Sequence, residues 1–139
     1  KNNIDIESFL QKELNHFINL KNRELIGLGF RINQYDKLFF GLGAMYEIEQ
    51  YNTIYKESKF FKSTNYINHK ISLFTSLEFN NVIYYQFKVS EPSDYRILWD
   101  GNISFQMADN FSFHINTHLR YDTSGESYFE ISNGIGLQF

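Results

Sequence analysis

The feature that most constrains this chain is an alternation of apolar and polar residues that persists along nearly its whole length. Between residues 111 and 121, apolar side chains such as Phe113 and Ile115 alternate with polar ones such as His114. Successive side chains of a β-strand point to opposite faces, so a period of two predicts a strand with one apolar and one polar face. Helical spacing fits less well, even over residues 4–20. The chain is therefore expected to be all-β.

About eight segments share this alternation, and no change in composition between them marks a domain boundary. Aromatic residues make up 19% of the chain and there is one proline, a composition that favours extended, pleated structure. We expect a single domain over residues 1–139, built as an antiparallel up-and-down barrel. The expected strands are residues 4–14, 26–32, 38–49, 67–79, 83–89, 95–107, 111–121 and 127–139.

The links between these segments alternate in length. Barrels of bacterial outer membranes have short periplasmic turns and longer extracellular loops, and an even number of strands places both chain ends on the side of the short turns. The sequence fits this alternation of short and long connections, because turn-forming residues occupy the short ones. The expected short links are residues 33–36, 80–81 and 108–110, and the expected long ones are residues 16–22, 51–64, 90–94 and 122–126.

Alternation alone does not say whether the apolar face lines a core or faces lipid, but other features favour lipid. The chain ends in Phe139 on an alternating segment, which resembles the signal by which outer-membrane barrels are recognised for assembly. Tyrosines and Trp99 on the apolar face lie near several segment ends, where an aromatic girdle is expected. Glycines such as Gly41 and Gly43 lie on the polar face, which suits a narrow interior filled by long side chains. We expect a transmembrane β-barrel in the bacterial outer membrane.

Several short motifs add a family resemblance. Residues 23–31 read Arg-Glu-Leu-Ile-Gly-Leu-Gly-Phe-Arg and residues 41–49 read Gly-Leu-Gly-Ala-Met-Tyr-Glu-Ile-Glu. With residues 93–97, 119–122 and 136–139, they resemble the salt-induced outer-membrane protein family, a group of unknown function, and especially its Bacteroidetes-type members. The resemblance covers nearly the whole chain. It implies a barrel with a structural or envelope-adaptation role and no catalytic residues. Family members carry further strands ahead of the position of Lys1, so the resemblance leaves open an N-terminally truncated sequence and a larger native barrel.

The interior of the expected barrel is predicted to hold a network of paired charges. A barrel of about eight strands is just filled by its own side chains, so no open pore is expected. Buried charges are tolerated when they are paired or hydrogen-bonded. Glu47 and Glu49 stand about 7 Å apart on one strand face, a spacing that paired glycosidase carboxylates also show, but such catalysis needs a cleft that a filled barrel lacks. The predicted network comprises Glu47, Glu49, Arg31, Lys70, Arg96, Arg120 and Glu130.

The longest expected link carries lysines interleaved with aromatic residues. Lys56, Lys59 and Lys62 are candidates for contacts with lipopolysaccharide phosphates, and an ordinary solvated loop is the simpler interpretation. The other expected partners are membrane lipid and the barrel-assembly machinery, which would recognise Phe139. A net charge of −3 gives no basic surface for nucleic acid. The oligomeric state is left open by the sequence.

Two other functions stay open at this point. A lipid-modifying barrel enzyme would need His69 or His114 within hydrogen-bond reach of a serine and an acid at the rim. A soluble calycin-like barrel would instead enclose a small apolar ligand between Phe113, Ile115 and Leu137. The two alternatives make opposite demands on the fold, because the second places the apolar face inside.

Metal, redox and cofactor chemistry are not expected. The chain contains no cysteine, so it offers neither a disulfide nor a thiolate metal ligand. His114 and His118 share one strand face but stand about 13 Å apart at the usual strand rise, which is too far for both to bind one metal ion.

Overall fold

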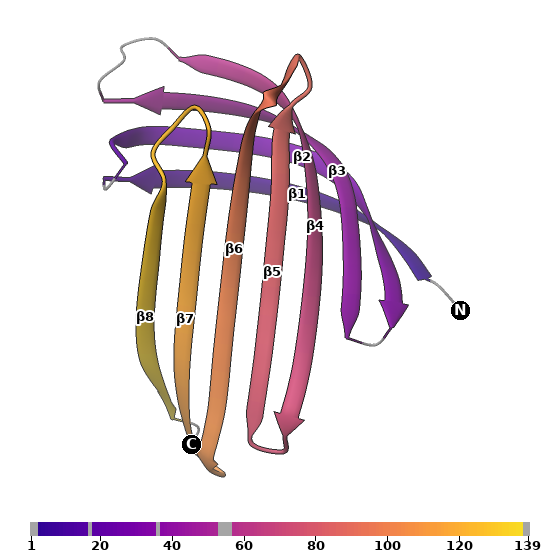
Figure 1. Cartoon of the computed structure of the whole chain (residues 1–139), viewed down its shortest axis with the longest axis vertical. Helices are drawn as coiled ribbons and strands as arrows, with labels where there is room; N and C mark the ends of the chain where they lie inside the picture. The colour runs from indigo at the N-terminus through magenta and orange to yellow at the C-terminus, as the bar shows by residue number, and fades with distance from the viewer. Residues whose placement is uncertain (1–2, 17, 36, 53–56, 138–139) are drawn as a thin grey trace.

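The computed structural model describes residues 3–16, 18–35, 37–52 and 57–137, and within these ranges it consists of strands, turns and loops without a helix (Figure 1). No helix of the described chain is long and apolar enough to cross a membrane. The strands are β1 (Asn3–Asn15), β2 (Leu20–Tyr35), β3 (Leu38–Tyr51), β4 (Ser58–Phe74), β5 (Leu77–Lys88), β6 (Glu91–Ala108), β7 (Phe111–Asp122) and β8 (Tyr128–Leu137).

All eight strands belong to one sheet, in which each strand pairs antiparallel with its neighbour in the sequence. The all-β, antiparallel, up-and-down arrangement of eight strands predicted from the alternation is therefore confirmed. Antiparallel neighbours joined by short connections need no crossover, so the order in space follows the order in the chain. We call the two ends of the sheet the loop end (connections 16–19, 52–57, 89–90 and 123–127) and the turn end (connections 36–37, 75–76 and 109–110).

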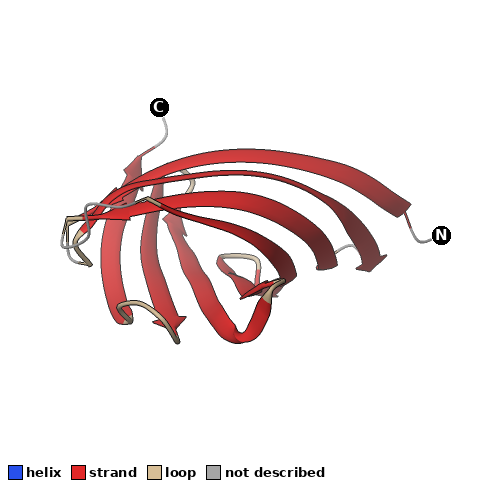
Figure 2. Cartoon of the chain, turned by 90° about the horizontal axis from the view of Figure 1, so that it is seen from above, coloured by secondary structure: helices blue, strands red, loops and turns tan. Residues whose placement is uncertain are grey.

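The described strands do not close into a barrel, so the structure shows the predicted up-and-down sheet without the predicted closure. Among the described residues, β1 pairs only with β2 and β8 only with β7. The strands twist and coil into a curved wall, as paired strands generally do, but the curvature stops short of a full circuit (Figure 2). The wall curls around a hollow of about 800 Å³ that is lined by residues of all eight strands, and we refer to it as the hollow.

The two faces of the wall have the opposite polarity to that of an ordinary globular protein. Among the described residues, 24 large hydrophobic side chains are exposed, and Leu10 and Ile6 reach 81% and 78% exposure. Only four hydrophobic residues are buried, against nine polar or charged ones, among them Glu47 at 0%. Most monomeric soluble proteins bury apolar residues and leave charged ones in water. The predicted alternation is thus present, with the polar face on the concave side.

Most strands are longer than predicted, and one turn lies elsewhere. Residues 67–79 were expected to form one strand ending at a turn of Asn80 and Asn81, but the chain turns at Thr75 and Ser76 instead. A two-residue turn by itself would put the directly opposite Phe74 and Leu77, one even and one odd in number, on the same face. The register shift between Ser72 and Phe74 restores the parity (odd or even residue number), so Ile71 and Phe79 are opposite and both odd, and the alternation continues through the turn. The connection expected at residues 90–94 is also short, because β6 begins at Glu91.

Glycines on the concave face make room for aromatic rings. A Cβ atom added to Gly41 would lie 1.9 Å from the Tyr66 ring, and one added to Gly27 would lie 2.2 Å from the Phe9 ring. Such contacts are too close for any side chain. These rings therefore lie over glycines of neighbouring strands, so the glycines of the polar face make room for bulky side chains, while the interior also contains the hollow.

Candidate functional site

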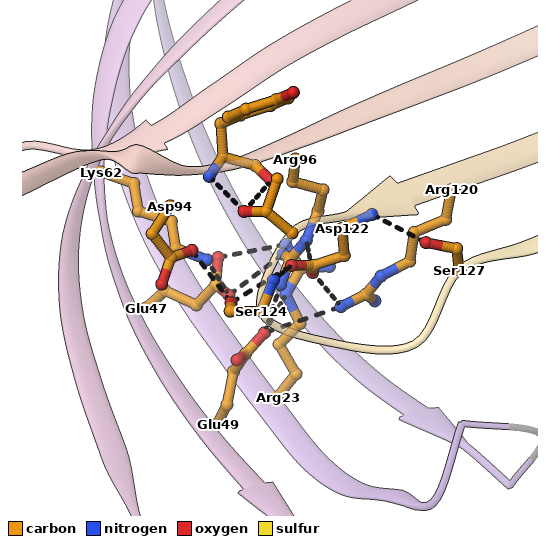
Figure 3. A network of polar contacts seen from close by, with 12 residues as sticks. Arg23, Glu47, Glu49, Lys62, Asp94, Arg96, Arg120, Asp122, Ser124 and Ser127 are labelled. Carbon is orange, nitrogen blue, oxygen red and sulfur yellow. Dashed lines mark hydrogen bonds and ion pairs between the residues drawn. The ribbon is translucent and has the colours of Figure 1, made fainter.

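A buried cluster of charges at the loop end is the most distinctive site of the described chain (Figure 3). Four basic groups meet four acidic groups there, so the formal charges balance. Six of the eight strands contribute a side chain from the concave face. The charge cluster consists of Glu13 (β1), Arg23 (β2), Glu47 and Glu49 (β3), Lys62 (β4), Arg96 (β6), and Arg120 and Asp122 (β7).

Arg96 connects the two halves of the sheet. Its Nε donates to Asp122 Oδ2 at 2.7 Å, and its two terminal nitrogens donate to Glu49 Oε1 at 2.8 Å and Glu47 Oε1 at 3.2 Å. The side chain is only 3% exposed. A guanidinium presents five donors in a rigid plane, and here it bridges carboxylates on β3 and β7. Because the strands β4 and β5 lie between β3 and β6, this bridge can form only where the sheet curls.

Glu47 is the most deeply buried carboxylate, and three cations surround it. Arg23 NH2 donates to Glu47 Oε2 at 3.1 Å, and Lys62 Nζ donates to Glu47 Oε1 at 3.0 Å. Arg96 supplies the third contact. An ionised carboxylate out of contact with water is tolerable only with such partners, because isolated burial of a charge costs many kcal/mol. Arg23 is in turn held by Glu13 at 2.8 Å.

The loop between β7 and β8 is tied to the charge cluster through Asp122. Asp122 accepts hydrogen bonds from Arg96 and from Arg120, the latter at 3.1 Å. The other carboxylate oxygen accepts from the backbone N–H of Ser124 at 3.1 Å, and the backbone N–H of Asp122 donates to Ser127 Oγ at 3.0 Å. Asp122 therefore links the buried charges to the surface loop above them.

The charge cluster is arranged to hold strands together rather than to carry out acid–base chemistry. General acid–base catalysis needs a carboxyl that can reach a substrate proton. Here the carboxylate oxygens of Glu47 and Asp122 already accept hydrogen bonds from cations or loop groups, and both side chains are at most 3% exposed. The cluster lies at the loop end of the curled sheet, and three of its members, Glu13, Arg23 and Arg120, also line the hollow.

The seven residues predicted for the interior charge network lie in different parts of the sheet. Glu47, Glu49, Arg96 and Arg120 meet in the charge cluster. Arg31 lies apart and pairs with Asp5 at 3.5 Å and Glu7 at 3.1 Å, and its guanidinium stacks over the Phe39 ring. Lys70 pairs with Glu78 at 3.0 Å in an exposed position near the turn end, and Glu130 is exposed.

Four members of the charge cluster were not among its predicted residues. Glu13 lies on the polar face of a predicted strand but was not named for the network, and Arg23, Lys62 and Asp122 lay outside the predicted strands. The signal that identifies them is parity. Arg23 has the parity of Arg31 on β2, and Asp122 has that of Arg120 on β7, so each lies on the concave face. These positions were assigned to strand ends or loops because their strands were predicted too short.

The structure corrects one of the three candidate surface lysines. Lys62 was predicted to contact lipopolysaccharide from a loop, but it lies on β4, is 4% exposed and is bound by Glu47. The surface prediction is wrong here because β4 begins at Ser58, which carries Lys62 into the sheet. Lys59 is 56% exposed beside Glu57. Lys56 and the predicted assembly signal Phe139 lie outside the described residues.

The histidines differ in their surroundings. His69 is exposed on β4. His114 Nε2 lies 2.8 Å from Ser112 Oγ, so one of the two histidines proposed for an enzyme does reach a serine. His118 contacts Asp100. The described residues contain no group of three His, Asp or Glu side chains that could hold a metal ion.

The side chains named for an internal apolar cavity lie elsewhere. Leu137 is 60% exposed, and neither Phe113 nor Ile115 lines the hollow. Charged and tyrosine side chains such as Glu7 and Tyr66 lie along it. The hollow is lined by apolar side chains such as Phe9 and Met45 as well as by polar ones, and none of the three residues named for an apolar ligand is among them.

Comparison with known proteins leaves the family open. No protein-family model, curated protein or solved structure matches this chain. The likeness to the salt-induced outer-membrane proteins therefore rests on the sequence motifs alone.

Proposed function

We propose that this chain is a β-barrel protein of the bacterial outer membrane, with a structural role in the cell envelope and no catalytic activity. The observation that carries the proposal is the reversed polarity of the sheet: 24 large hydrophobic side chains are exposed on it, while its buried residues are mainly charged or polar. Water would disfavour such a surface by about 25 cal/mol per Å² of apolar area, whereas hydrocarbon would accept it. A bilayer is therefore the solvent that suits this surface.

A row of tyrosines on the outer face supports the same proposal. The Tyr85 and Tyr95 ring centroids lie 5.7 Å apart, and those of Tyr95 and Tyr121 lie 6.1 Å apart. The three residues come from β5, β6 and β7 and stand at the loop end. Aromatic side chains gather at the membrane–water boundary because one end is apolar and the other polar. The row would mark the outer boundary of the hydrocarbon layer.

The charge cluster suggests a structural role rather than transport. It fills the loop end of the curled sheet with paired charges from six strands. An eight-stranded barrel is narrow enough to be filled by its own side chains. Paired charges across the barrel interior would stiffen the barrel and block the passage of solutes. This agrees with the envelope-adaptation role that the family resemblance implies.

The proposed partners follow from the position in the membrane. Lipid would cover the apolar face, and lipopolysaccharide phosphates would meet the exposed Lys59, together with Lys56. Phe139 would serve the barrel-assembly machinery as its recognition signal.

Heat modifiability in detergent tests the proposal. The purified chain is folded in detergent micelles and run on SDS gels with and without boiling. A folded membrane barrel resists SDS until it is boiled, so we expect a compact band that shifts to the unfolded position on boiling, with protease protection only in detergent. A chain that stays soluble and monomeric without detergent would contradict the proposal.

A second candidate function, lipid hydrolysis, is favoured by one contact. Ser112 Oγ and His114 Nε2 are 2.8 Å apart, the distance at which a histidine can take the proton of a nucleophilic serine. A Cβ at Gly136 would lie 2.5 Å from Ser112 Oγ, so glycine gives the pair its space. All three line a recess of about 340 Å³ near the turn end.

A fluorophosphonate probe, which reacts with activated serines, separates the two functions. An enzyme would be labelled, and Ser112→Ala would abolish labelling, whereas Ser104→Ala on the neighbouring strand would not. We expect no labelling of the folded wild-type protein above that of Ser112→Ala. Stoichiometric labelling that depends on Ser112 and His114 would overturn the structural role.

A further inference from the structure

We propose that β1 and β8 pair directly with each other in the membrane, in the register that places Phe129 opposite Lys12. This inference rests on the proposed membrane function and names the contact that closes the wall. It concerns two strand edges that pair with no strand among the described residues: one edge of β1 over residues 3–14 and one edge of β8.

Hydrocarbon does not tolerate such edges. It offers no water to unpaired N–H and C=O groups, so membrane-spanning sheets close on themselves. In water the same edges would invite pairing with other chains. A lipid-facing position of this sheet therefore requires that both edges find a partner strand.

The directions of the strands make each edge a suitable partner for the other. The strands alternate in direction and their number is even, so β1 and β8 run antiparallel. A single strand inserted between them would have to run parallel to one of the two, which up-and-down barrels avoid. Both edges already face the same space, because Glu13 of β1 and Tyr128 of β8 line the one hollow. They diverge toward the turn end, where the first residues of β1 and the last residues of β8 lie far apart (Figure 1).

The observed registers determine how a closed circuit would return to β1. Starting from Ile4, the residue directly opposite on each next strand can be followed across the whole sheet. All of these residues have the parity of the apolar face. The series runs Ile4, Ile32, Phe40, Ile67, Ile83, Trp99, Leu119 and Phe129.

Closure then pairs Phe129 with a β1 residue that is displaced from Ile4 by a fixed shift. Neighbouring strands lie about 4.8 Å apart and rise about 3.4 Å per residue. If eight such strands tilt by about 35–45° from the barrel axis, one circuit of the barrel moves the directly opposite position along β1 by about 8 to 11 residues. An odd shift would place apolar residues of β8 opposite β1 residues of the polar face, so the shift must be even. The possible shifts are therefore roughly 8 or 10 residues.

The side chains on the outer face select the smaller shift. With a shift of eight, Ile131 faces Leu10 and the polar Asn133 faces the polar Ser8, so Phe129 with Lys12 is the one mixed pair on the lipid side. With a shift of ten, three pairs are mixed: Ile131 with Lys12, Asn133 with Leu10 and Ile135 with Ser8. Cross-strand pairs of like polarity stabilise a sheet, and mixed pairs do not.

The side chains on the inner face select the same shift. With a shift of ten, Glu130 would stand directly opposite Glu13, and like charges in that position repel each other. With a shift of eight, Tyr128 faces Glu13 and Gly134 faces Glu7. A Cβ at Gly134 would have no atom within 4 Å in the open sheet, so the space beside it is free for the Glu7 side chain.

Cysteine cross-linking tests the register, and the chain has no cysteine of its own. Disulfides need Cβ atoms about 3.5–4.5 Å apart. Residues directly opposite come close to this separation, and diagonal ones lie farther apart. We expect Leu10→Cys with Ile131→Cys to cross-link within one chain in detergent, and Leu10→Cys with Asn133→Cys to cross-link several-fold less. Phe113→Cys with Ile135→Cys, which are directly opposite on β7 and β8, is the positive control.

Each result has a definite meaning. Preferential cross-linking of Leu10 with Asn133 would overturn the proposed register. Cross-linked dimers would place a second copy on the edges and overturn direct pairing. If neither β1–β8 pair cross-links while the Phe113–Ile135 control does, other strands separate the two edges. These failures differ from failure of the membrane function, in which the chain shows no heat modifiability and needs no detergent.

Discussion

Replacing Arg96 by methionine should destabilise the folded chain more than replacing any exposed cation. Methionine keeps much of the volume of arginine but removes the charge and the donors. The variant leaves Glu47, Glu49 and Asp122 each short of one hydrogen bond inside the charge cluster. The formal balance of the cluster is also lost, because four carboxylates then face three cations.

The magnitude follows from burial. Arg96 is 3% exposed and its partners are 0–6% exposed, so water cannot replace the lost contacts. Removing one member of a buried ion pair costs about 3–5 kcal/mol. Lys70 and Glu78, at 48% and 49% exposure, form an ion pair at 3.0 Å whose loss should cost about 0–1 kcal/mol. Lys70→Met is therefore a matched control.

Urea unfolding in detergent measures the difference. Trp99 is the one tryptophan in the sequence, and its fluorescence reports on the sheet. With a slope of about 2 kcal/mol per molar urea, Arg96→Met should lower the midpoint by about 1.5–2.5 M and Lys70→Met by less than about 0.5 M. Adding Glu49→Gln to Arg96→Met restores the charge balance and should recover part of the loss.

Equal shifts for Arg96→Met and Lys70→Met would refute the reasoning. Such a result would mean that the buried cluster contributes no more than an exposed ion pair. A double variant that is less stable than Arg96→Met alone would show that Glu49 is stabilised by its other cations and not chiefly by Arg96.

Two further predictions concern the faces of the sheet. In liposomes, lipids brominated on their acyl chains should quench Trp99 fluorescence strongly, because Trp99 lies on the outer face; quenching no stronger than that by a water-soluble quencher would place this face outside the bilayer. Gly41→Ala should lower the free energy of unfolding by about 1–3 kcal/mol, because the new Cβ would overlap the Tyr66 ring, whereas Gly134→Ala should have little effect. Equal urea midpoints for these two variants would show that the Tyr66 ring moves aside at no cost.

The class of fold could be predicted from the sequence because a period of two is a local property. Each alternating segment, such as residues 111–121, identifies a strand and its two faces without knowledge of its neighbours. The same parity extends to Arg23 and Asp122, so their place on the concave face was also encoded locally. The turn at Thr75 and Ser76 was not visible, because the register shift between Ser72 and Phe74 keeps the alternation in step across it.

The sequence by itself determined the strands, their up-and-down order and the division into apolar and polar faces. Only the tertiary structure decided how far the sheet curls and which charges meet. Glu47 and Arg96 are 49 residues apart and come together through the curvature of four strands, β3 to β6. Curvature is the sum of small twists at every strand pair, so it belongs to the assembled sheet and leaves no mark in any one segment.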